Sequence, residues 1–169
     1  PMSRPRKFDE DDVVERAMEE FWTNGYAATS PARLAEATGV AKGSLYNAFS
    51  SKRALFERCL DKYQQQIAKL AEGLMDHPGS TRECLRDALR AVVDSDLAQV
   101  RRRGCLIGNT AVELAGDDPD LARKIRKMQS ESTAWFARRV ERGQREGDVR
   151  PDLDATAFAE HMATTLAGL

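Results

Sequence analysis

The chain has 169 residues, of which 41% are hydrophobic and 31% are charged, a balance that allows one or two small packed domains. Its formal net charge of −1 at pH 7 excludes a uniformly basic coat for nucleic acids, and no apolar run approaches the roughly 18 residues of a membrane helix. Three scattered cysteines and two histidines argue against a disulfide framework, a histidine metal site and a catalytic triad, and they fit a reducing cytoplasm.

The N-terminal part of the chain predicts two helices. Apolar residues recur there at intervals of three and four, as they do along nearly the whole chain, which indicates an all-α protein. The first helix is expected to begin after its cap, Asp9, and to end at Gly25. Ser30 and Pro31 form a start signal for a second helix, which is expected to reach about Ala37.

A glycine turn and a short third helix follow. Gly39 permits the left-handed backbone conformation of a tight turn, and the third helix is expected to begin near Lys42. Leu45 and Phe49 are four residues apart and should lie on its buried side. Two short helices joined by a glycine turn, the second exposing small polar side chains, are typical of a helix-turn-helix.

The rest of the chain predicts a second helical block. A long fourth helix is expected from about Lys52 to Leu74, and the stretch DHPGS at 76–80 then breaks the helical pattern. Further helices are expected from Ser80, at Cys105–Ala115, from Asp118, and after a loop at 146–152. No stop signal stands at Leu169, so the native protein is expected to continue beyond it.

Side chains at the start of the third helix suit the major groove of B-DNA. A helix approaches that groove closely where its leading side chains are short or can hydrogen-bond with base edges. Gly43 and Ser44 permit close approach. Lys42 and Asn47 can reach base edges or phosphates, and Tyr46 offers a hydroxyl to a phosphate. These five residues are therefore expected to form a surface that reads DNA.

Other residues are placed to bind phosphate. Thr29, Ser30 and Lys52 are expected at helix N-termini, where backbone N–H groups attract anions. Arg33 should face outward from the second helix and contact a phosphate or a base; the alternative is a solvated surface arginine. Three basic residues before the first helix would either enter the minor groove as an arm or form a plain terminus: Arg4, Arg6 and Lys7.

The stretch FWTNGYAATSPARLAEATGVAKGSLYNAFSSKRALFERCL resembles the TetR/AcrR transcriptional regulators. The family has a glycine–aromatic pair after helix one, a hydroxyl pair that starts helix two, a glycine turn, and a fixed pattern through helix three into helix four. Matching residues here are Gly25-Tyr26, Thr29-Ser30, Thr38-Gly39-Val40, Gly43, Leu45, Tyr46, Phe49, Lys52 and Leu55. Ala48 stands where the family often has His or Tyr, and Arg53 stands where an acid is common.

The resemblance implies an all-α protein with two domains. Residues 1–51 would form a three-helix bundle with the helix-turn-helix, and residues 52–169 a helical effector-binding and dimerisation domain whose last helix is lacking or cut short. It implies a cytoplasmic, nucleoid-associated homodimer that binds a palindromic operator in double-stranded DNA and is released by a small-molecule effector. Repression is the family's usual mode of action. The fourth helix links the two domains and would transmit the change that effector binding causes.

Several residues of the second block are candidates for an effector pocket. They are polar groups on otherwise apolar helices, with apolar residues as walls; core packing is the alternative for the aromatic ones. The candidates are Asn109, Thr110, Met128, Gln129, Thr133, Trp135, Phe136, Phe158, His161 and Met162.

Two alternatives to a ligand-released repressor remain. Cys105 follows three arginines and opens a helix, and both features favour a thiolate, so a repressor that senses oxidants or electrophiles is one alternative. A small buried hydrophobe is the plainer interpretation of Cys105. An all-α interaction adaptor without DNA binding is the other alternative. No nucleophile–base pair, glycine-rich phosphate loop or suggestive carboxylate pair occurs, so neither an enzyme nor a cofactor or metal site is expected.

Overall fold

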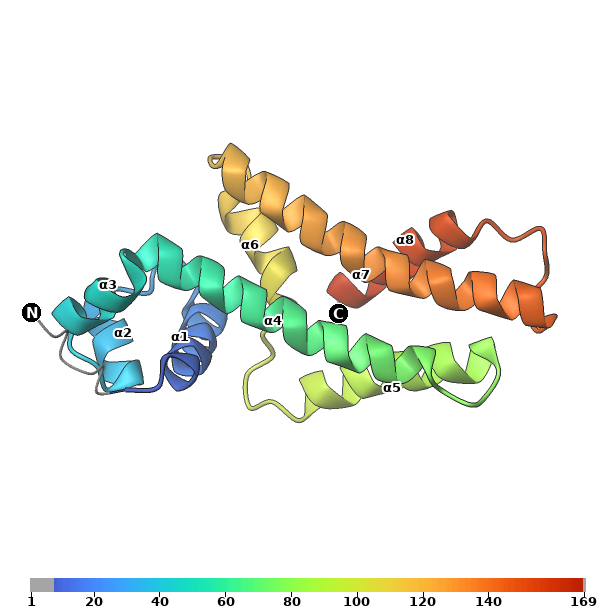
Figure 1. Cartoon of the computed structure of the whole chain (residues 1–169), viewed down its shortest axis with the longest axis horizontal. Coiled ribbons are helices and arrows are strands. Elements are labelled where there is room, and N and C mark those ends of the chain that lie inside the picture. Colours follow the sequence, from blue (N-terminus) through green and yellow to red (C-terminus); the bar gives the residue numbers. More distant parts are fainter. Residues whose placement is uncertain (1–7, 169) are drawn as a thin grey trace, which may run out of the picture. The chain divides into compact units, whose positions relative to one another are not determined.

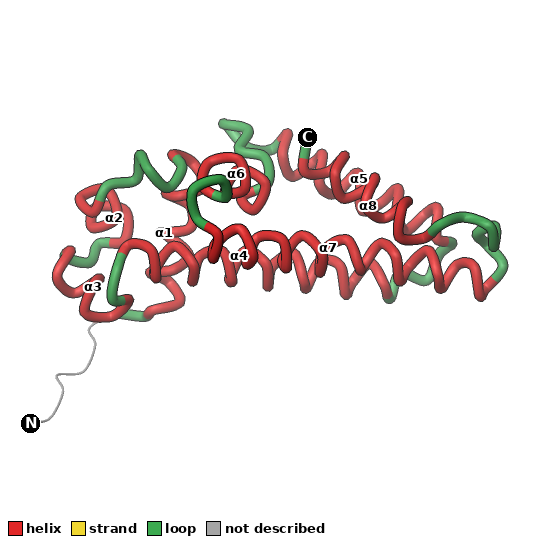
Figure 2. The backbone as a smooth tube through the Cα atoms, turned by 90° about the horizontal axis from the view of Figure 1, so that it is seen from above, coloured by secondary structure: helices red, strands yellow, loops and turns green. Residues whose placement is uncertain are grey.

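The computed structural model describes residues 8–168, which form eight α-helices and no strands (Figures 1 and 2). The helices are α1 (Glu10–Asn24), α2 (Pro31–Thr38), α3 (Lys42–Phe49), α4 (Lys52–Met75), α5 (Thr81–Leu97), α6 (Leu106–Leu114), α7 (Pro119–Glu146) and α8 (Ala155–Ala167). The predicted all-α fold is confirmed. None of the helices described here is both long enough and apolar enough to span a bilayer.

The chain divides into two compact units within α4, after Gln64. The first unit holds α1, α2, α3 and the beginning of α4, and the second holds the end of α4 and α5 to α8. The predicted domain boundary, between residues 51 and 52, falls at the start of α4. One continuous helix therefore belongs to both units.

The core of the first unit forms where α1 buries one face against the other helices. Phe21 is 1% exposed, and its ring centroid lies 4.9 Å from that of Phe56 on α4. Leu34 of α2 and Leu45 of α3 are also almost fully buried. Burying such side chains supplies much of the free energy that stabilises a small bundle, on the order of 2 kcal/mol for each.

Local signals in the sequence set the helix ends. The Asp9 side chain accepts from the backbone of Asp11 at the start of α1, and Gly25, with φ 80°, ends that helix. Ser80 and Glu83 form a capping box at the start of α5. Each of these contacts joins residues at most three apart, which is why the spacing of the residue types predicts them.

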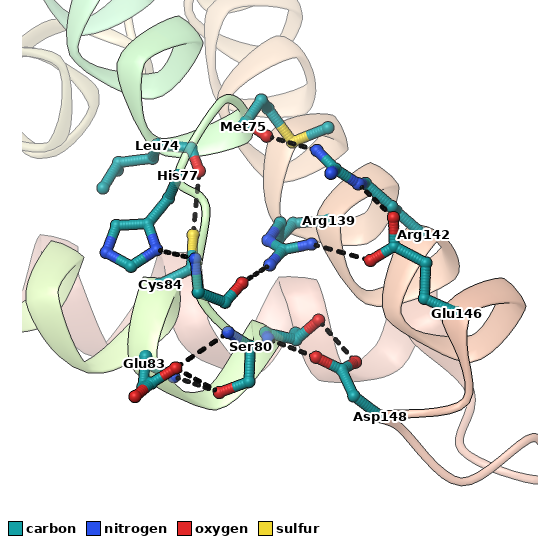
Figure 3. A network of polar contacts seen from close by, with 12 residues as sticks. Leu74, Met75, His77, Ser80, Glu83, Cys84, Arg139, Arg142, Glu146 and Asp148 are labelled. Atoms are coloured by element: carbon teal, nitrogen blue, oxygen red, sulfur yellow. Dashed lines mark hydrogen bonds and ion pairs between the residues drawn. The ribbon is translucent and has the colours of Figure 1, made fainter.

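In the second unit, α7 packs along α8, and α6 packs against α7. Leu121, Ile125 and Val140 are the most deeply buried apolar residues of α7. Figure 3 shows a polar network at the carboxyl ends of α4 and α7. Arg139 and Arg142 reach from α7 to backbone carbonyls: Nη2 of Arg139 donates to Gly79 at 2.8 Å, and Nη1 of Arg142 to Met75 at 2.7 Å.

Candidate nucleic-acid interface

The turn between α2 and α3 has a backbone that only a few residue types adopt readily. Gly39 ends α2 with φ 70° and ψ 14°, in the left-handed region. The Thr38 hydroxyl donates to the Leu34 carbonyl at 2.6 Å and accepts from the Val40 amide at 3.3 Å. Val40 is buried directly after the turn. These contacts fix the direction in which α3 leaves α2.

Helix α3 has one buried side and one polar, exposed side. Leu45 and Phe49 are 1% and 4% exposed and face the core of the first unit. Lys42, Ser44 and Asn47 are exposed, and among residues 8–168 none of their side chains has a hydrogen-bond or ion-pair partner. The polar side of α3 is therefore not used within the first unit.

Gly43 leaves open space on the exposed side of α3. A Cβ atom built at Gly43 would meet no heavy atom within 4 Å, and its φ is not positive. The fold therefore does not require glycine at this position, although glycine in a helix costs roughly 0.5–1 kcal/mol relative to alanine. The small residue leaves room for a body that approaches α3 from outside.

Tyr46 lies at the edge of this surface. It is half-buried, and burial raises the pKa of its phenol, so the hydroxyl stays protonated at neutral pH and can donate a hydrogen bond. The α3 N-terminus carries no side-chain cap, because Ala41 occupies the N-cap position. Its first N–H groups can consequently serve an anion.

The other predicted DNA-contacting residues have partners within the first unit. Ser30 caps α2 by accepting from the Arg33 amide at 3.2 Å. The half-exposed Arg33 side chain forms an ion pair with Glu20, with an Nε–Oε1 distance of 2.9 Å. The Lys52 ammonium lies 4.3 Å from the ring centroid of Tyr26. DNA contacts from Arg33 or Lys52 would compete with these interactions.

Thr29 lies in the core, contrary to its predicted place on the surface. The residue is 0% exposed, and its hydroxyl donates to the Gly25 carbonyl at 2.6 Å. We therefore leave Thr29 out of the proposed interface. Arg53, one of the two residues that depart from the family pattern, pairs with Glu57 at 2.7 Å on the same helix. The predicted minor-groove arm of Arg4, Arg6 and Lys7 lies outside the described residues.

The predicted effector-pocket residues are spread over the second unit. Met128 and Met162 are buried, whereas Asn109, Gln129 and His161 are exposed. Asn109 donates to the Arg103 carbonyl at 2.6 Å and so supports the turn before α6. Three others are half-buried on α7: Thr133, Trp135 and Phe136. The second unit does contain a groove, and of the candidate residues only Phe158 and Met162 border it.

The three cysteines differ in exposure. Cys59 and Cys84 are buried and donate to backbone carbonyls, those of Val14 at 3.5 Å and Leu74 at 2.9 Å. Burial raises the pKa of the Cys59 thiol far above its usual range. Cys105 is half-exposed, so it is not the fully buried hydrophobe of the plainer interpretation. Its sulfur accepts from the Gly108 amide at 3.4 Å at the N-terminus of α6.

A glycine turn followed by a helix with an exposed polar side is the arrangement of a helix-turn-helix, the motif with which many transcriptional regulators bind DNA. The chain belongs to the TetR family. Residues 13–59 match the family model described as "Bacterial regulatory proteins, tetR family", and residues 83–169 match that of the "Tetracyclin repressor-like, C-terminal domain". Within the described part of the chain, no cluster of three or more His, Cys, Asp or Glu residues could hold a metal ion.

Known regulators resemble the chain over nearly its whole length. It is 30% identical to the transcriptional repressor ComR of Escherichia coli K12, over 98% of this chain and 80% of ComR. It is also 30% identical to the regulator YezE of Bacillus subtilis 168, over 95% of this chain and 84% of YezE. A solved complex of a cysteine-substituted CifR, a TetR-family regulator, with 26-bp operator DNA matches with a TM-score of 0.88 and 35% identity, over 98% of this chain and 87% of CifR.

Proposed function

We propose that the chain is a ligand-responsive one-component repressor that binds a palindromic operator as a homodimer and leaves it when a small-molecule effector binds. The observation that carries this proposal is the exposed side of α3, where Lys42, Ser44 and Asn47 have no partner and Gly43 leaves room for a close approach. Such a surface suits hydrogen bonds with base edges and phosphates. The complex of CifR with operator DNA supports the same mode of binding.

The proposed dimer explains why the operator should be palindromic. Two copies of α3 related by a two-fold axis would enter successive major grooves about 34–36 Å apart. Exposed apolar side chains in the second unit support a partner-facing surface there. They are Leu70, Val92, Val93, Leu97, Val100 and Val112.

Helix α4 offers a route from the second unit to α3, because it begins directly after α3 and ends in the second unit. Its carboxyl end is held by Arg142, which donates to Met75, and by Cys84, which donates to Leu74. A ligand that prefers an arrangement of these contacts incompatible with DNA binding would lower operator affinity. The ligand must therefore bind the state that cannot bind DNA more tightly than the state that can.

The proposal is tested by selecting bound duplexes from random DNA and measuring affinity in a shift assay. Tyr46→Phe should weaken binding to every duplex by removing a phosphate donor, and Lys42→Ala should relax the preference at one base pair by about 1–3 kcal/mol. Arg126→Ala, an exposed arginine of α7, is the control. Operator affinity that neither variant changes would exclude α3 as the reading helix. Weak, salt-independent binding without a preferred sequence would favour the adaptor.

A cysteine-based sensor is the second candidate, because Cys105 is the one cysteine that is not buried and its sulfur lies at a helix N-terminus. The maleimide reaction rate of each thiol in the folded protein tests it. A sensor requires Cys105 to react faster than an unfolded peptide thiol and its modification to release the operator. A Cys105→Ser variant that oxidants or electrophiles still release from the operator as they release the parent would leave the sensor without support.

A further inference from the structure

The second unit contains an apolar groove bordered by α5, the carboxyl half of α7, the α7–α8 loop and α8. Its volume is about 510 Å³, which lies in the range of small-molecule sites. Its apolar lining is formed by Leu85, Leu89, Val140, Leu153, Phe158 and Met162. An apolar body placed against these side chains would be removed from water, which favours binding.

Three arginines follow one edge of this groove. Arg82, Arg86 and Arg90 are spaced four residues apart on α5, so they lie along the same side of the helix. Arg86 is engaged by its neighbour, with its Nε 3.1 Å from Oδ1 of Asp87. Arg82 and Arg90 have neither a hydrogen bond nor an ion pair with any residue between 8 and 168. Two arginines without an ionic partner among these residues therefore border the apolar surface.

The carboxylate at the groove is already engaged. Asp148 accepts from the Thr81 amide at 2.6 Å and from the Thr81 hydroxyl at 2.9 Å. These hydrogen bonds, with the nearby charges of Arg139 and Arg142, lower the pKa of Asp148, so it stays ionised at neutral pH. Figure 3 shows Asp148 held beside this network. The charge left for a ligand at the groove is consequently positive.

We propose that this groove binds an amphipathic organic anion, a carboxylate with an aliphatic body. The body would lie against Leu85, Leu89 and Phe158, and the carboxylate would bind Arg82 or Arg90. Guanidinium groups suit this role, because they donate two parallel hydrogen bonds to a carboxylate. This step rests on the function proposed above: if that function is correct, the anion is the effector.

The groove borders contacts that reach α4. Thr81 and Asp148 line it, and Asp148 lies next to Arg139 and Arg142. Those arginines hold the carbonyls of Gly79 and Met75. A ligand that shifts the Thr81–Asp148 pair therefore acts on the contacts that hold the carboxyl end of α4, the helix that begins beside α3.

Titration calorimetry of the full chain with sodium dodecanoate tests the binding site. Dodecanoate should bind, acetate should not, and dodecyltrimethylammonium, which has the same tail and the opposite charge, should bind at least about tenfold more weakly. The double variant Arg82→Gln/Arg90→Gln should lose about tenfold or more in dodecanoate affinity. Its matched control, Arg101→Gln/Arg126→Gln, removes the same charge from exposed arginines outside the groove and should bind as the parent does.

Three results would overturn the site: no binding of dodecanoate, equal binding of the cationic amphiphile, or equal losses in the two double variants. Thermal unfolding of each variant confirms that it is folded. A shift assay on the same samples separates the two proposals. Operator binding without dodecanoate binding refutes the groove alone, whereas dodecanoate binding without operator binding refutes the function and leaves the groove standing.

Discussion

Gly39 sets the direction of α3 through its backbone alone. A Cβ atom there would meet nothing within 4 Å, so only its φ of 70° makes glycine necessary. Gly39→Ala should therefore destabilise the first unit by about 1–2 kcal/mol, and Gly39→Asn by less, because asparagine tolerates the left-handed region. Urea unfolding followed by Trp22 fluorescence in a Trp135→Phe background measures both variants. Equal losses for Ala and Asn would show that the cost has another origin.

Gly43 differs from Gly39, because its replacement should raise stability and lower operator affinity. Because the added methyl group enters open space in a regular helix, Gly43→Ala should stabilise the first unit, by up to about 1 kcal/mol. The same methyl group lies where α3 would meet DNA, so operator affinity should fall. Unfolding and shift assays on one preparation measure both effects. A variant that is more stable and binds DNA as tightly as the parent would show that close approach at Gly43 is not needed.

Single residues also show where sequence patterns mislead. Thr29 follows the family pattern and is polar, yet its hydroxyl bonds to a carbonyl four residues earlier and the residue is buried. His161 and Gln129 are polar residues on apolar helices, as a pocket would require, yet they are exposed. Periodicity identifies the sides of one helix, but it does not show which neighbouring helix covers each side. Helix caps are predictable because both partners lie within one turn.

At the scale of elements, α7 contains a glycine that packing demands. A Cβ atom at Gly143 would collide with the Thr81 hydroxyl, Asp148 and Val149. The Asp148 carboxylate can therefore reach Thr81, at the start of α5, only because Gly143 has no side chain. This contact joins residues 67 positions apart, and no local pattern in the sequence indicates it. The helix ends could be predicted from the sequence, whereas the contact between Asp148 and the start of α5, like the groove beside it, could not.

Gly143 and Gly73 both lie within helices, so replacing each with alanine tests whether packing requires glycine at position 143. Gly143→Ala should destabilise the second unit by about 1–3 kcal/mol, because overpacking outweighs the gain in helix propensity. Gly73→Ala in α4 adds a methyl group to open space and should stabilise by up to about 1 kcal/mol. Denaturant midpoints of the two variants, followed by Trp135 fluorescence, provide the comparison. If both substitutions shift the midpoint in the same direction, the close contact at Gly143 is not a constraint.

At the scale of the whole molecule, the two units share α4, and the stability of the second unit rests partly on one carboxylate. Asp148 binds the start of α5 and lies beside Arg139, which binds the Gly79 carbonyl, and Arg142, which holds the end of α4. Its hydrogen bonds from Thr81 lower its pKa in the folded state. A carboxyl group with a lowered folded pKa stabilises the protein above its unfolded pKa of about 3.9, and this stabilisation is lost as pH falls through the folded pKa.

Asp148→Asn should therefore lower the unfolding midpoint at pH 7, because the amide keeps the shape of the carboxylate but loses its charge. The difference from the parent should shrink as pH falls below about 4, because the carboxyl group of the unfolded parent becomes protonated there and that of the folded parent at still lower pH. Urea titrations at several pH values, followed by Trp135 fluorescence, measure it. Asp117→Asn, an exposed loop residue whose side chain contacts no partner among residues 8–168, should match the parent throughout. A deficit in Asp148→Asn that stays constant down to pH 3 would mean that the charge of Asp148 is not the cause of the deficit.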